Sequence, residues 1–318
     1  MEIEPACKHD ALKIISIVVP VYYNEPSLPV LFEALLDVEK KLTKKNVIME
    51  LIFVDDGSGD HSLQELLKIK QRRPDTKVIK LTRNFGAAHA SKTGLQFVTG
   101  NCFLMLAADL QDPPELIIDM IDKWLQGTKF VLCKRTQRLD PPISKLFAYI
   151  FYKLLRFLVI KNYPSRGFDL ALMVRAMLPY MQNSSKNINL PLFAYWLGFK
   201  PEIILYVRQK RRFGRSRYTL SKKIKYFLDS LVGFSVAPIR IISLTGFFVS
   251  LASFGYGTLI VINALRGKIV VLGFATVVTI LSFLLGLIIM MLGVIGEYIW
   301  RIFDELNKRP ESVIDEIY

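Results

Sequence analysis

Two long runs without charge near the carboxyl end of the chain limit its fold more than any other feature. Residues 241–265 and 269–296 are apolar stretches of 25 and 28 residues without Asp, Glu, Lys or Arg. As a helix, the shorter one is about 38 Å long, enough to cross a hydrocarbon core about 30 Å thick. We therefore predict two transmembrane helices within residues 235–302. The alternative is a very apolar helical hairpin in a soluble protein.

The short connection between the two runs predicts the topology of the chain. Only Arg266, Gly267 and Lys268 separate them, so both outer ends of the hairpin face the same side of the membrane. The 318-residue chain has a net charge of +14 and its flanking segments are basic, which favours the cytoplasmic side. Residues 1–13 do not resemble a signal peptide. We expect a two-pass integral membrane protein with its amino-terminal part and both termini in the cytoplasm.

The first half of the chain alternates between strand and helix patterns. Short β-rich runs occupy residues 14–21, 49–55, 77–82, 101–107 and 129–133. Helical patterns lie between them, at residues 27–45, 62–72, 87–98 and 114–125. This alternation predicts an α/β fold with a mostly parallel sheet, whose ligands bind beyond the carboxyl ends of the strands.

Five parts follow from these patterns. They are a tail at 1–13, an α/β domain at 14–200, a basic juxtamembrane loop and helix at 201–234, the two transmembrane helices at 235–302, and a cytoplasmic tail at 303–318.

Two segments outside the sheet point to a membrane surface. Residues 143–161 are rich in Leu, Phe and Tyr with interspersed Lys and Arg, which is typical of an amphipathic helix at the lipid headgroups. An ordinary packed helix is the alternative. Residues 200–225 contain ten Lys or Arg and one acid. This cluster anchors the chain to the membrane side, binds phosphate through its arginines, or does both.

Polar residues follow the first two predicted strands. Pro20 to Glu25 follow the first, and Asp55, Asp56 and Ser58 follow the second. Carboxylates at this edge can accept hydrogen bonds from a base and a ribose, although Ser58 or Asp60 also suits a helix cap. No GxGxxG or GxxxxGK[ST] motif occurs, which argues against an NAD site or a P-loop ATP site.

The fourth strand ends in a more specific pattern. Asp109 is followed two residues later by Gln111, and two such oxygen ligands suit a hard divalent ion that bridges a nucleotide diphosphate. Asp112 precedes Pro113 and Pro114, a pattern that predicts a turn and a helix start.

These segments together resemble the family 2 glycosyltransferases of GT-A fold, and especially the membrane-anchored polyprenyl-phosphate hexosyltransferases, such as the bactoprenol glucosyltransferases and dolichol-phosphate mannose synthases. The resemblance covers residue 15 to about residue 310. The motifs that carry it are VVPVYYNE, FVDDGSGD, LTRNFGAAHASKTGL, ADLQDPPE and the Arg-rich loop before the two apolar runs.

The resemblance implies roles for individual residues. The nucleotide sugar would bind to Pro20, Tyr22, Glu25, Asp55, Asp56, Arg83, Asn84, Asp109, Arg212 and Ser216. The acceptor phosphate would bind to Arg135, Arg138, Arg215, Arg217 and Tyr218. For Arg135 and Arg138, solvated surface charges are the alternative. Asp109 and Gln111 would hold Mg²⁺ or Mn²⁺, and Asp109, Arg135 and Asp169 would be catalytic.

The chain also departs from the family pattern. Ala107 stands where many relatives have the first acid of an acid-x-acid motif, so a weaker metal site is expected. The additional tyrosine at Tyr22 and Tyr23 leaves the alignment open by one residue. Asp169 stands where some relatives have Arg; it would orient a sugar hydroxyl, act as a base, or only cap a helix.

The resemblance implies inverting transfer of a hexose, glucose from UDP-glucose, to a polyprenyl phosphate such as undecaprenyl phosphate at the cytoplasmic membrane face. The alternatives are GDP-mannose or another UDP-sugar as the donor, or a non-catalytic membrane scaffold. A processive polysaccharide synthase is disfavoured because no Gln-x-x-Arg-Trp sequence occurs. No nucleic-acid-binding motif accompanies the basic residues, and small residues in the apolar runs favour a homo-oligomer.

Overall fold

The computed structural model describes residues 12–136, 142–164, 167–209, 212–213, 220–266, 273–307 and 309–318. The chain divides into two compact units. The first unit comprises Met1–Ser230 and Pro310–Tyr318, and the second comprises Leu231–Arg309.

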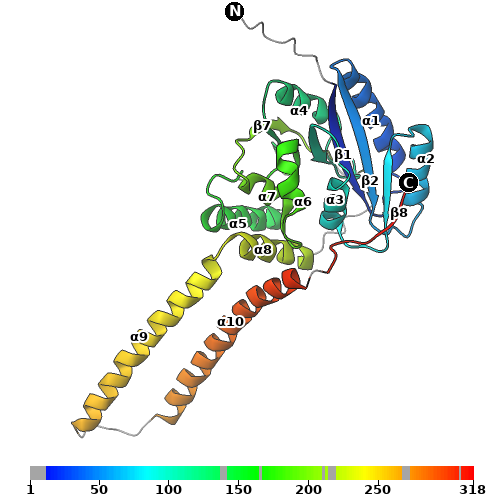
Figure 1. The fold of residues 1–318 in the computed structure, drawn as a ribbon. Helices are drawn as coiled ribbons and strands as arrows, with labels where there is room; N and C mark the ends of the chain where they lie inside the picture. The colour runs from blue at the N-terminus through cyan, green and yellow to red at the C-terminus, as the bar shows by residue number, and fades with distance from the viewer. Residues whose placement is uncertain are drawn as a thin grey trace, which may run out of the picture. The chain divides into compact units, whose positions relative to one another are not determined.

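An eight-stranded sheet forms the centre of the first unit, in the order β7-β5-β6-β4-β1-β2-β3-β8 (Figure 1). Its strands are β1 (Lys13–Val21), β2 (Val47–Asp55), β3 (Lys77–Leu81), β4 (Cys102–Met105), β5 (Phe130–Arg135), β6 (Leu170–Val174), β7 (Glu202–Tyr206) and β8 (Ile314–Ile317). The pairs among β1 to β4 are parallel, as is β5 with β7, whereas β6 and β8 are antiparallel to their neighbours. The predicted α/β fold with a mostly parallel sheet is confirmed.

Helices pack on both faces of the sheet. They are α1 (Leu28–Thr43), α2 (Ser62–Arg72), α3 (Ala87–Leu95), α4 (Leu116–Leu125), α6 (Leu178–Gln182) and α7 (Leu190–Trp196), with a short 3₁₀ turn at Arg175–Met177. Two further helices are α5 (Pro142–Leu158) and α8 (Leu220–Phe234). One buried core contains apolar residues of α1, α2 and α4, and the other contains those of α3, α6 and α7. Neighbouring residues of β2 alternate between these cores, as the period of a strand requires: Leu51 and Phe53 in the first, Ile52 and Val54 in the second.

The last strand, β8, returns the carboxyl end of the chain to the sheet. Ile317 pairs with Ile79, and the backbones of Tyr318 and Val78 exchange two hydrogen bonds, of 2.8 and 3.3 Å. The strand covers the outer edge of β3, which would otherwise expose unpaired backbone groups. The sequence predicts only a tail here, because a four-residue strand carries almost no periodic signal.

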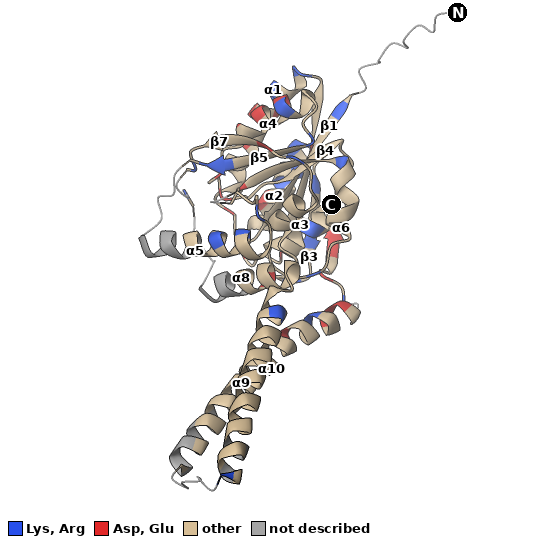
Figure 2. Ribbon diagram, turned by 90° about the vertical axis from the view of Figure 1, so that its left-hand side faces the viewer, with Lys and Arg blue, Asp and Glu red and all other residues tan. Residues whose placement is uncertain are grey.

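The second unit contains two long helices, α9 (Ala237–Leu265) and α10 (Phe274–Leu306). Within them, Ala237–Leu259 and Phe283–Leu306 are long and apolar enough to cross a membrane, and neither window is buried inside the protein. Figure 2 shows that the described parts of both helices carry few charged residues. These are the two helices predicted from the sequence, and their exposure argues against a packed soluble hairpin.

The amphipathic segment forms the helix α5, and its side chains differ sharply in exposure. Phe157 and Tyr149 are 81% and 60% exposed, whereas Leu155 is 4% exposed. The helix therefore buries one side and presents aromatic residues on another. Its predicted contact with lipid headgroups stays a prediction.

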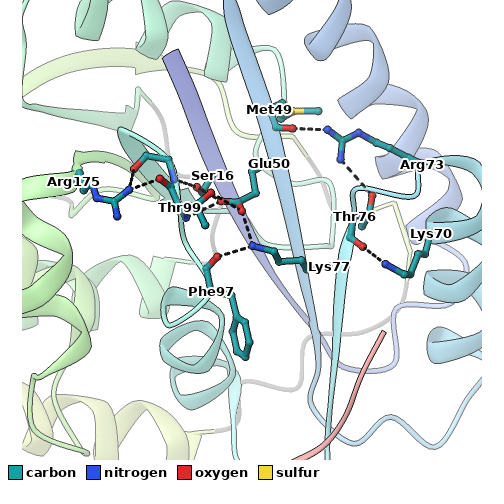
Figure 3. A network of polar contacts seen from close by, with 11 residues as sticks. Ser16, Met49, Glu50, Lys70, Arg73, Thr76, Lys77, Phe97, Thr99 and Arg175 are labelled. Atoms are coloured by element: carbon teal, nitrogen blue, oxygen red, sulfur yellow. Dashed lines mark hydrogen bonds and ion pairs between the residues drawn. The ribbon is translucent and has the colours of Figure 1, made fainter. Parts of the chain in front are cut away.

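A polar network lies near the amino ends of β3 and β4, away from the strand ends that the sequence marks as functional (Figure 3). The carboxylate of Glu50 accepts hydrogen bonds from the Ser16 hydroxyl at 2.5 Å and the Lys77 ammonium at 2.7 Å. It also accepts from the backbone N–H and the hydroxyl of Thr99, each at 2.9 Å. Arg175 donates to the carbonyl oxygen of Thr99. The network joins three strands and a loop at this end of the sheet.

We expect Glu50→Ala to lower the free energy of unfolding of the first unit by about 2 to 3 kcal/mol, because it leaves several donors without their shared acceptor. Burial raises the pKa of the Glu50 carboxyl, but Lys77, Ser16 and Thr99 hold the net pKa below its ordinary value. The contribution of Glu50 to stability is therefore complete at a pH above the pKa that its carboxyl has in the unfolded chain. This contribution is lost as the pH falls through the pKa of the same carboxyl in the folded protein.

Denaturant unfolding in detergent between about pH 3 and pH 7 measures this effect. Glu33→Ala is the matched control, because Glu33 pairs with Arg72 through side chains that are 60% and 56% exposed. Such a pair contributes less than about 1 kcal/mol. Equal effects of the two substitutions would contradict the role of Glu50.

Candidate active site

The predicted site residues gather at one edge of the sheet because the parallel strands end there. Val21 at the end of β1 pairs with Asp55 at the end of β2. Arg135 at the end of β5 pairs with Tyr206 at the end of β7. The antiparallel strand β6 begins at this edge, which brings Asp169, the residue before it, to the same place. This edge is where the alternating pattern predicted a ligand site.

The loop after β1 is fastened to the loop after β2. Tyr23 has a φ of +56° and its N–H donates to the Ser58 hydroxyl at 3.1 Å. Glu25 accepts from the backbone N–H of His61 at 3.1 Å, so part of its carboxylate holds the loop together. Pro20 lies within β1 and Tyr22 directly follows it, both half-buried.

The turn after β2 makes one contact with the start of the next helix. Helix α2 has His61 at its N-cap position, so neither Ser58 nor Asp60 occupies that position. Asp60 nevertheless accepts hydrogen bonds from the N–H of Ser62, the first residue of α2, and from the N–H of Glu25, whereas the Ser58 hydroxyl accepts from the Tyr23 N–H. These residues therefore shape the loop pair.

Asp55 is buried and only partly satisfied. Its Oδ2 accepts a long hydrogen bond of 3.4 Å from the Ser58 N–H, whereas its buried Oδ1 has no hydrogen-bond partner among the described residues. Burial raises the pKa of this carboxyl, although the Ser58 hydrogen bonds act in the opposite direction. A buried acceptor without a donor is costly, so Oδ1 is suited to an N–H or hydroxyl group of a ligand.

Asp56 holds a neighbouring loop. Its carboxylate accepts from the backbone N–H groups of Phe85 and Gly86 at 2.7 and 2.9 Å. The same loop carries Arg83, whose guanidinium lies 4.1 Å from the centre of the Phe85 ring, and Asn84; both are exposed. Asp56 therefore positions the loop that presents Arg83 and Asn84, a role that its place after a strand did not reveal.

Asp55→Asn should stabilise the protein without ligand by about 1 kcal/mol at pH 7, because it removes a buried charge beside Asp56. Because the pKa of Asp55 is raised in the folded protein, ionisation of its carboxyl opposes folding. The added stability of Asp55→Asn should therefore disappear at a pH where Asp55 is protonated in both the folded and the unfolded protein. Because the sequence resemblance implies a nucleotide sugar at Asp55, the same change should weaken its binding at least about tenfold. Thermal unfolding and equilibrium binding measure the two effects, and a variant that is less stable than the wild type yet binds normally would contradict both.

The loop after β4 presents the two predicted metal ligands. Leu110 has a φ of +56°, and the Gln111 N–H donates to Asp109 Oδ1 at 3.2 Å, which forms a tight turn. Among the described residues no group of three His, Cys, Asp or Glu could hold a metal ion. One carboxylate and one amide oxygen fit a hard ion that takes its other ligands from a diphosphate and water. Ala107, in place of a further acid, is exposed.

A buried polar cluster connects this loop to β5, β6 and β7. Asp169 binds Arg135 through both carboxylate oxygens, one at 3.0 Å from Nε, and accepts from the Tyr206 hydroxyl at 2.9 Å. The Tyr206 hydroxyl also lies 2.5 Å from Asp112, which accepts from Arg208 Nε at 3.1 Å. Arg208 Nη1 is 4.0 Å from Asp169. Two carboxylates therefore share one tyrosine hydroxyl, and each of them also binds a guanidinium group.

The cluster corrects one interpretation from the sequence and extends another. Asp169 precedes a strand and caps no helix. The turn and helix start predicted after Asp112 are present, because a turn at residues 114–115 leads into α4. Asp112 is in addition 4% exposed and binds Tyr206 and Arg208. Burial raises the pKa of Asp112, and Arg208 and Tyr206 oppose this. Tyr206, Arg208 and Asp112 were not predicted as site residues because their contacts join segments far apart in the chain.

The basic segment after β7 begins beside the loop after β4. The Gln209 N–H donates to the carbonyl oxygen of Gln111 at 3.0 Å, and exposed Arg212 donates to the Gln209 side chain at 3.2 Å. The other predicted residues of this loop and of the segment after β5 lie outside the described residues: Arg138, Arg215, Ser216, Arg217 and Tyr218.

The chain is similar to known proteins along almost all of its length. Residues 16–182 match the profile of Glycosyl transferase family 2. An uncharacterised glycosyltransferase of Bacillus subtilis (strain 168), YkcC, is 35% identical over 305 residues, covering 95% of this chain and 94% of the relative. A prophage bactoprenol glucosyl transferase homologue of Escherichia coli (strain K12) is 30% identical, covering 95% and 99%. The solved mannosyltransferase PcManGT of Pyrobaculum calidifontis, in complex with GDP-Man and Mn²⁺, is 16% identical with a TM-score of 0.43, covering 89% and 88%.

Proposed function

The chain belongs to glycosyl transferase family 2 and is a glycosyltransferase of GT-A fold, and on that premise we propose that it transfers a hexose from a nucleotide sugar to the phosphate of a polyprenyl phosphate. Glucose from UDP-glucose is the proposed donor group, and undecaprenyl phosphate the proposed acceptor. The name of the E. coli relative, a bactoprenol glucosyl transferase homologue, supports glucose as the sugar and a prenyl lipid as the acceptor. The product is a polyprenyl-phosphate-hexose.

One observation carries this proposal: acidic and basic groups suited to two anionic substrates lie at the same edge of one sheet. Asp55 ends β2 and Arg135 ends β5, whereas Asp109 lies in the loop after β4, four residues beyond Met105. Oδ1 of Asp55, which has no partner within the part of the chain that the structure describes, suits a base N–H or a ribose hydroxyl. The guanidinium of Arg135 suits a phosphate oxygen.

The acceptor supplies its own nucleophile. A phosphate monoester has a second pKa of about 6, so it is largely dianionic at pH 7 and needs no strong general base. The protein has to hold two anions close together and align the phosphate oxygen behind the anomeric carbon. This single displacement inverts the anomeric configuration, and the same configuration in donor and product would rule it out.

The residues of the polar cluster have defined tasks in this reaction. Asp169 fixes the Arg135 guanidinium through two hydrogen bonds and so orients its remaining N–H groups. With both oxygens engaged, Asp169 is better placed to position Arg135 than to accept a proton. A divalent ion, Mg²⁺ or Mn²⁺, held by Asp109 and Gln111 would neutralise charge on the departing diphosphate.

The apolar helices support a lipid acceptor. A long polyprenyl chain stays in the bilayer, so its phosphate is accessible only at the membrane surface. We propose that α9 and α10 span the membrane with the first unit and both termini in the cytoplasm, and that α5 contacts the headgroups. The small residues of the two helices suit packing between copies in a homo-oligomer.

Transfer of labelled sugar by the purified full chain in detergent tests this function. UDP-glucose, UDP-galactose, UDP-GlcNAc and GDP-mannose are each offered with undecaprenyl phosphate, with and without EDTA. Label in the lipid from UDP-glucose alone, lost with EDTA, is the expected result. Label from another donor would replace the proposed sugar, and no transfer from any donor by folded protein would favour a non-catalytic scaffold.

A further inference from the structure

A cavity of about 370 Å³ lies in the first unit beside the polar cluster. Asp169 belongs to both, and the start of α3, the end of β4, the strand β6, the segment before α7 and the helix α8 contribute to its wall. The small side chains of Ala87, Ala88 and Ala171 leave room, whereas Met105 gives it apolar surface. None of the residue roles proposed for the reaction places a ligand in this cavity.

The position of the cavity relates it to the donor. Helix α3 directly follows the loop that Asp56 holds, and Asp109 lies four residues after Met105, which ends β4 and belongs to the cavity wall. A group attached to a diphosphate bound at Asp109 therefore has this cavity within reach. Hexoses combine an apolar C–H face with several hydroxyl groups, which suits a wall that combines apolar side chains with polar and charged ones, Lys186 and Asp229 among them.

His89 and Glu311 form an unusual pair at this wall. His89 lines the cavity from α3, and Glu311 precedes β8 at the opposite end of the chain. Their atoms Nδ1 and Oε2 are both buried, are 3.6 Å apart, and have no hydrogen-bond partner among the described residues. A small movement of either side chain would join them.

Glu311 is itself held in place by the fold. Its other oxygen binds the ammonium group of Lys92, which is buried and also donates to the carbonyl oxygen of Ser184. Burial raises the pKa of Glu311, but His89 and Lys92 lower it below its ordinary value, so the side chain is a carboxylate at neutral pH. A carboxylate beside one ring nitrogen fixes the tautomer of an imidazole and leaves the other nitrogen as an acceptor.

We propose that the cavity binds the hexose of the nucleotide sugar and that His89, oriented by Glu311, accepts a hydrogen bond from one of its hydroxyl groups. This inference rests on the proposed function. It makes the carboxyl-terminal segment a part of the donor site, with Glu311 as a positioning residue that does not touch the sugar.

The test compares a nucleotide sugar with its nucleoside diphosphate, so that the hexose is the only difference. Equilibrium binding of UDP-glucose and UDP is measured for the full chain and for His89→Ala. We expect the substitution to weaken UDP-glucose binding about five- to tenfold, the equivalent of one hydrogen bond, and to leave UDP binding unchanged. His89→Gln, which retains a polar group, should recover part of the loss.

Glu311→Gln tests the positioning role. It should weaken UDP-glucose binding in the same direction, and the double variant with His89→Ala should be no weaker than His89→Ala alone, because both changes remove the same contact. Glu316→Gln is the matched control, since Glu316 lies in β8 and faces Lys80 at 3.9 Å. Thermal unfolding of each variant shows whether the segment is still docked.

The outcomes separate this inference from the proposed function. A wild-type chain that transfers hexose while His89→Ala binds UDP-glucose normally would overturn the inference alone. A His89→Ala effect on the KM of the polyprenyl phosphate, with donor binding unchanged, would assign the cavity to the lipid and overturn it as well. A folded wild-type chain that neither binds nor uses any nucleotide sugar would overturn both.

Discussion

Asp109→Asn is expected to lower kcat for hexose transfer about 1,000-fold or more, a loss of about 4 kcal/mol of transition-state stabilisation. Asp109 is the one carboxylate of the proposed metal site, because Ala107 replaces a further acid and Asp112 is engaged with Tyr206 and Arg208. Binding of Mn²⁺ in the presence of UDP, followed by electron paramagnetic resonance, should be lost in parallel with turnover.

Two variants control this experiment. Asp119→Asn removes a charge from the exposed surface of α4 and should leave transfer unchanged. Ala107→Asp adds an acid at an exposed position of the same loop and should tighten Mn²⁺ binding. Transfer by Asp109→Asn within about tenfold of the wild type would remove Asp109 from the metal site.

Asp169→Ala is expected to lower kcat/KM for the polyprenyl phosphate about 100- to 1,000-fold, because it removes the carboxylate that orients the Arg135 guanidinium, whereas Tyr206 keeps Asp112 as an acceptor. Asp169→Asn retains the shape and one acceptor oxygen, so it should recover part of the activity if Asp169 positions Arg135. Arg135→Ala combined with Asp169→Ala should cost little more than Arg135→Ala alone. Steady-state kinetics with varied acceptor measure these effects.

The pH profile separates a positioning role from a base. If the acceptor phosphate provides the nucleophile, the fall of activity toward acid, centred on a pKa of about 6, should persist in Asp169→Asn. Asp169 would instead be identified as the base by two results together: the fall of activity toward acid pH is lost in Asp169→Asn, and this variant is as inactive as Asp169→Ala. Asp37→Asn, on the surface of α1 with its side chain 69% exposed, is the control for general charge effects.

Much of the fold follows from patterns within short segments. The five strand patterns before residue 136 each became a strand, because β-branched and apolar residues with polar boundaries specify a buried strand locally. The two charge-free runs became α9 and α10 for a similarly local reason. The placement of Asp55, Asp109 and Arg135 at one edge also follows, because the carboxyl ends of parallel strands meet there.

The contacts between distant segments depend on the folded arrangement. Asp112 appears in the sequence as a turn residue before two prolines, yet it binds Arg208 and also Tyr206, which lies 94 residues further along the chain. Asp56 resembles Asp55 in its place at the end of β2, but one holds the loop at Phe85 whereas the other keeps an unpartnered buried oxygen among the described residues. Adjacent side chains at the end of a strand point in different directions. Their hydrogen-bond partners therefore depend on which loops lie next to each of them in the folded protein.

The carboxyl-terminal segment shows most clearly the difference between what local sequence patterns predict and what the folded arrangement decides. Its residues have no helical or alternating pattern of useful length, whereas in the structure β8 pairs with β3 and Glu311 reaches Lys92 and His89. Local chain preferences therefore set the strands, the helices and the order of the strand-end motifs. Pairing register and the burial of charges, which depend on residues as far apart as the 219 positions between Lys92 and Glu311, decided which side chains meet at the proposed donor site.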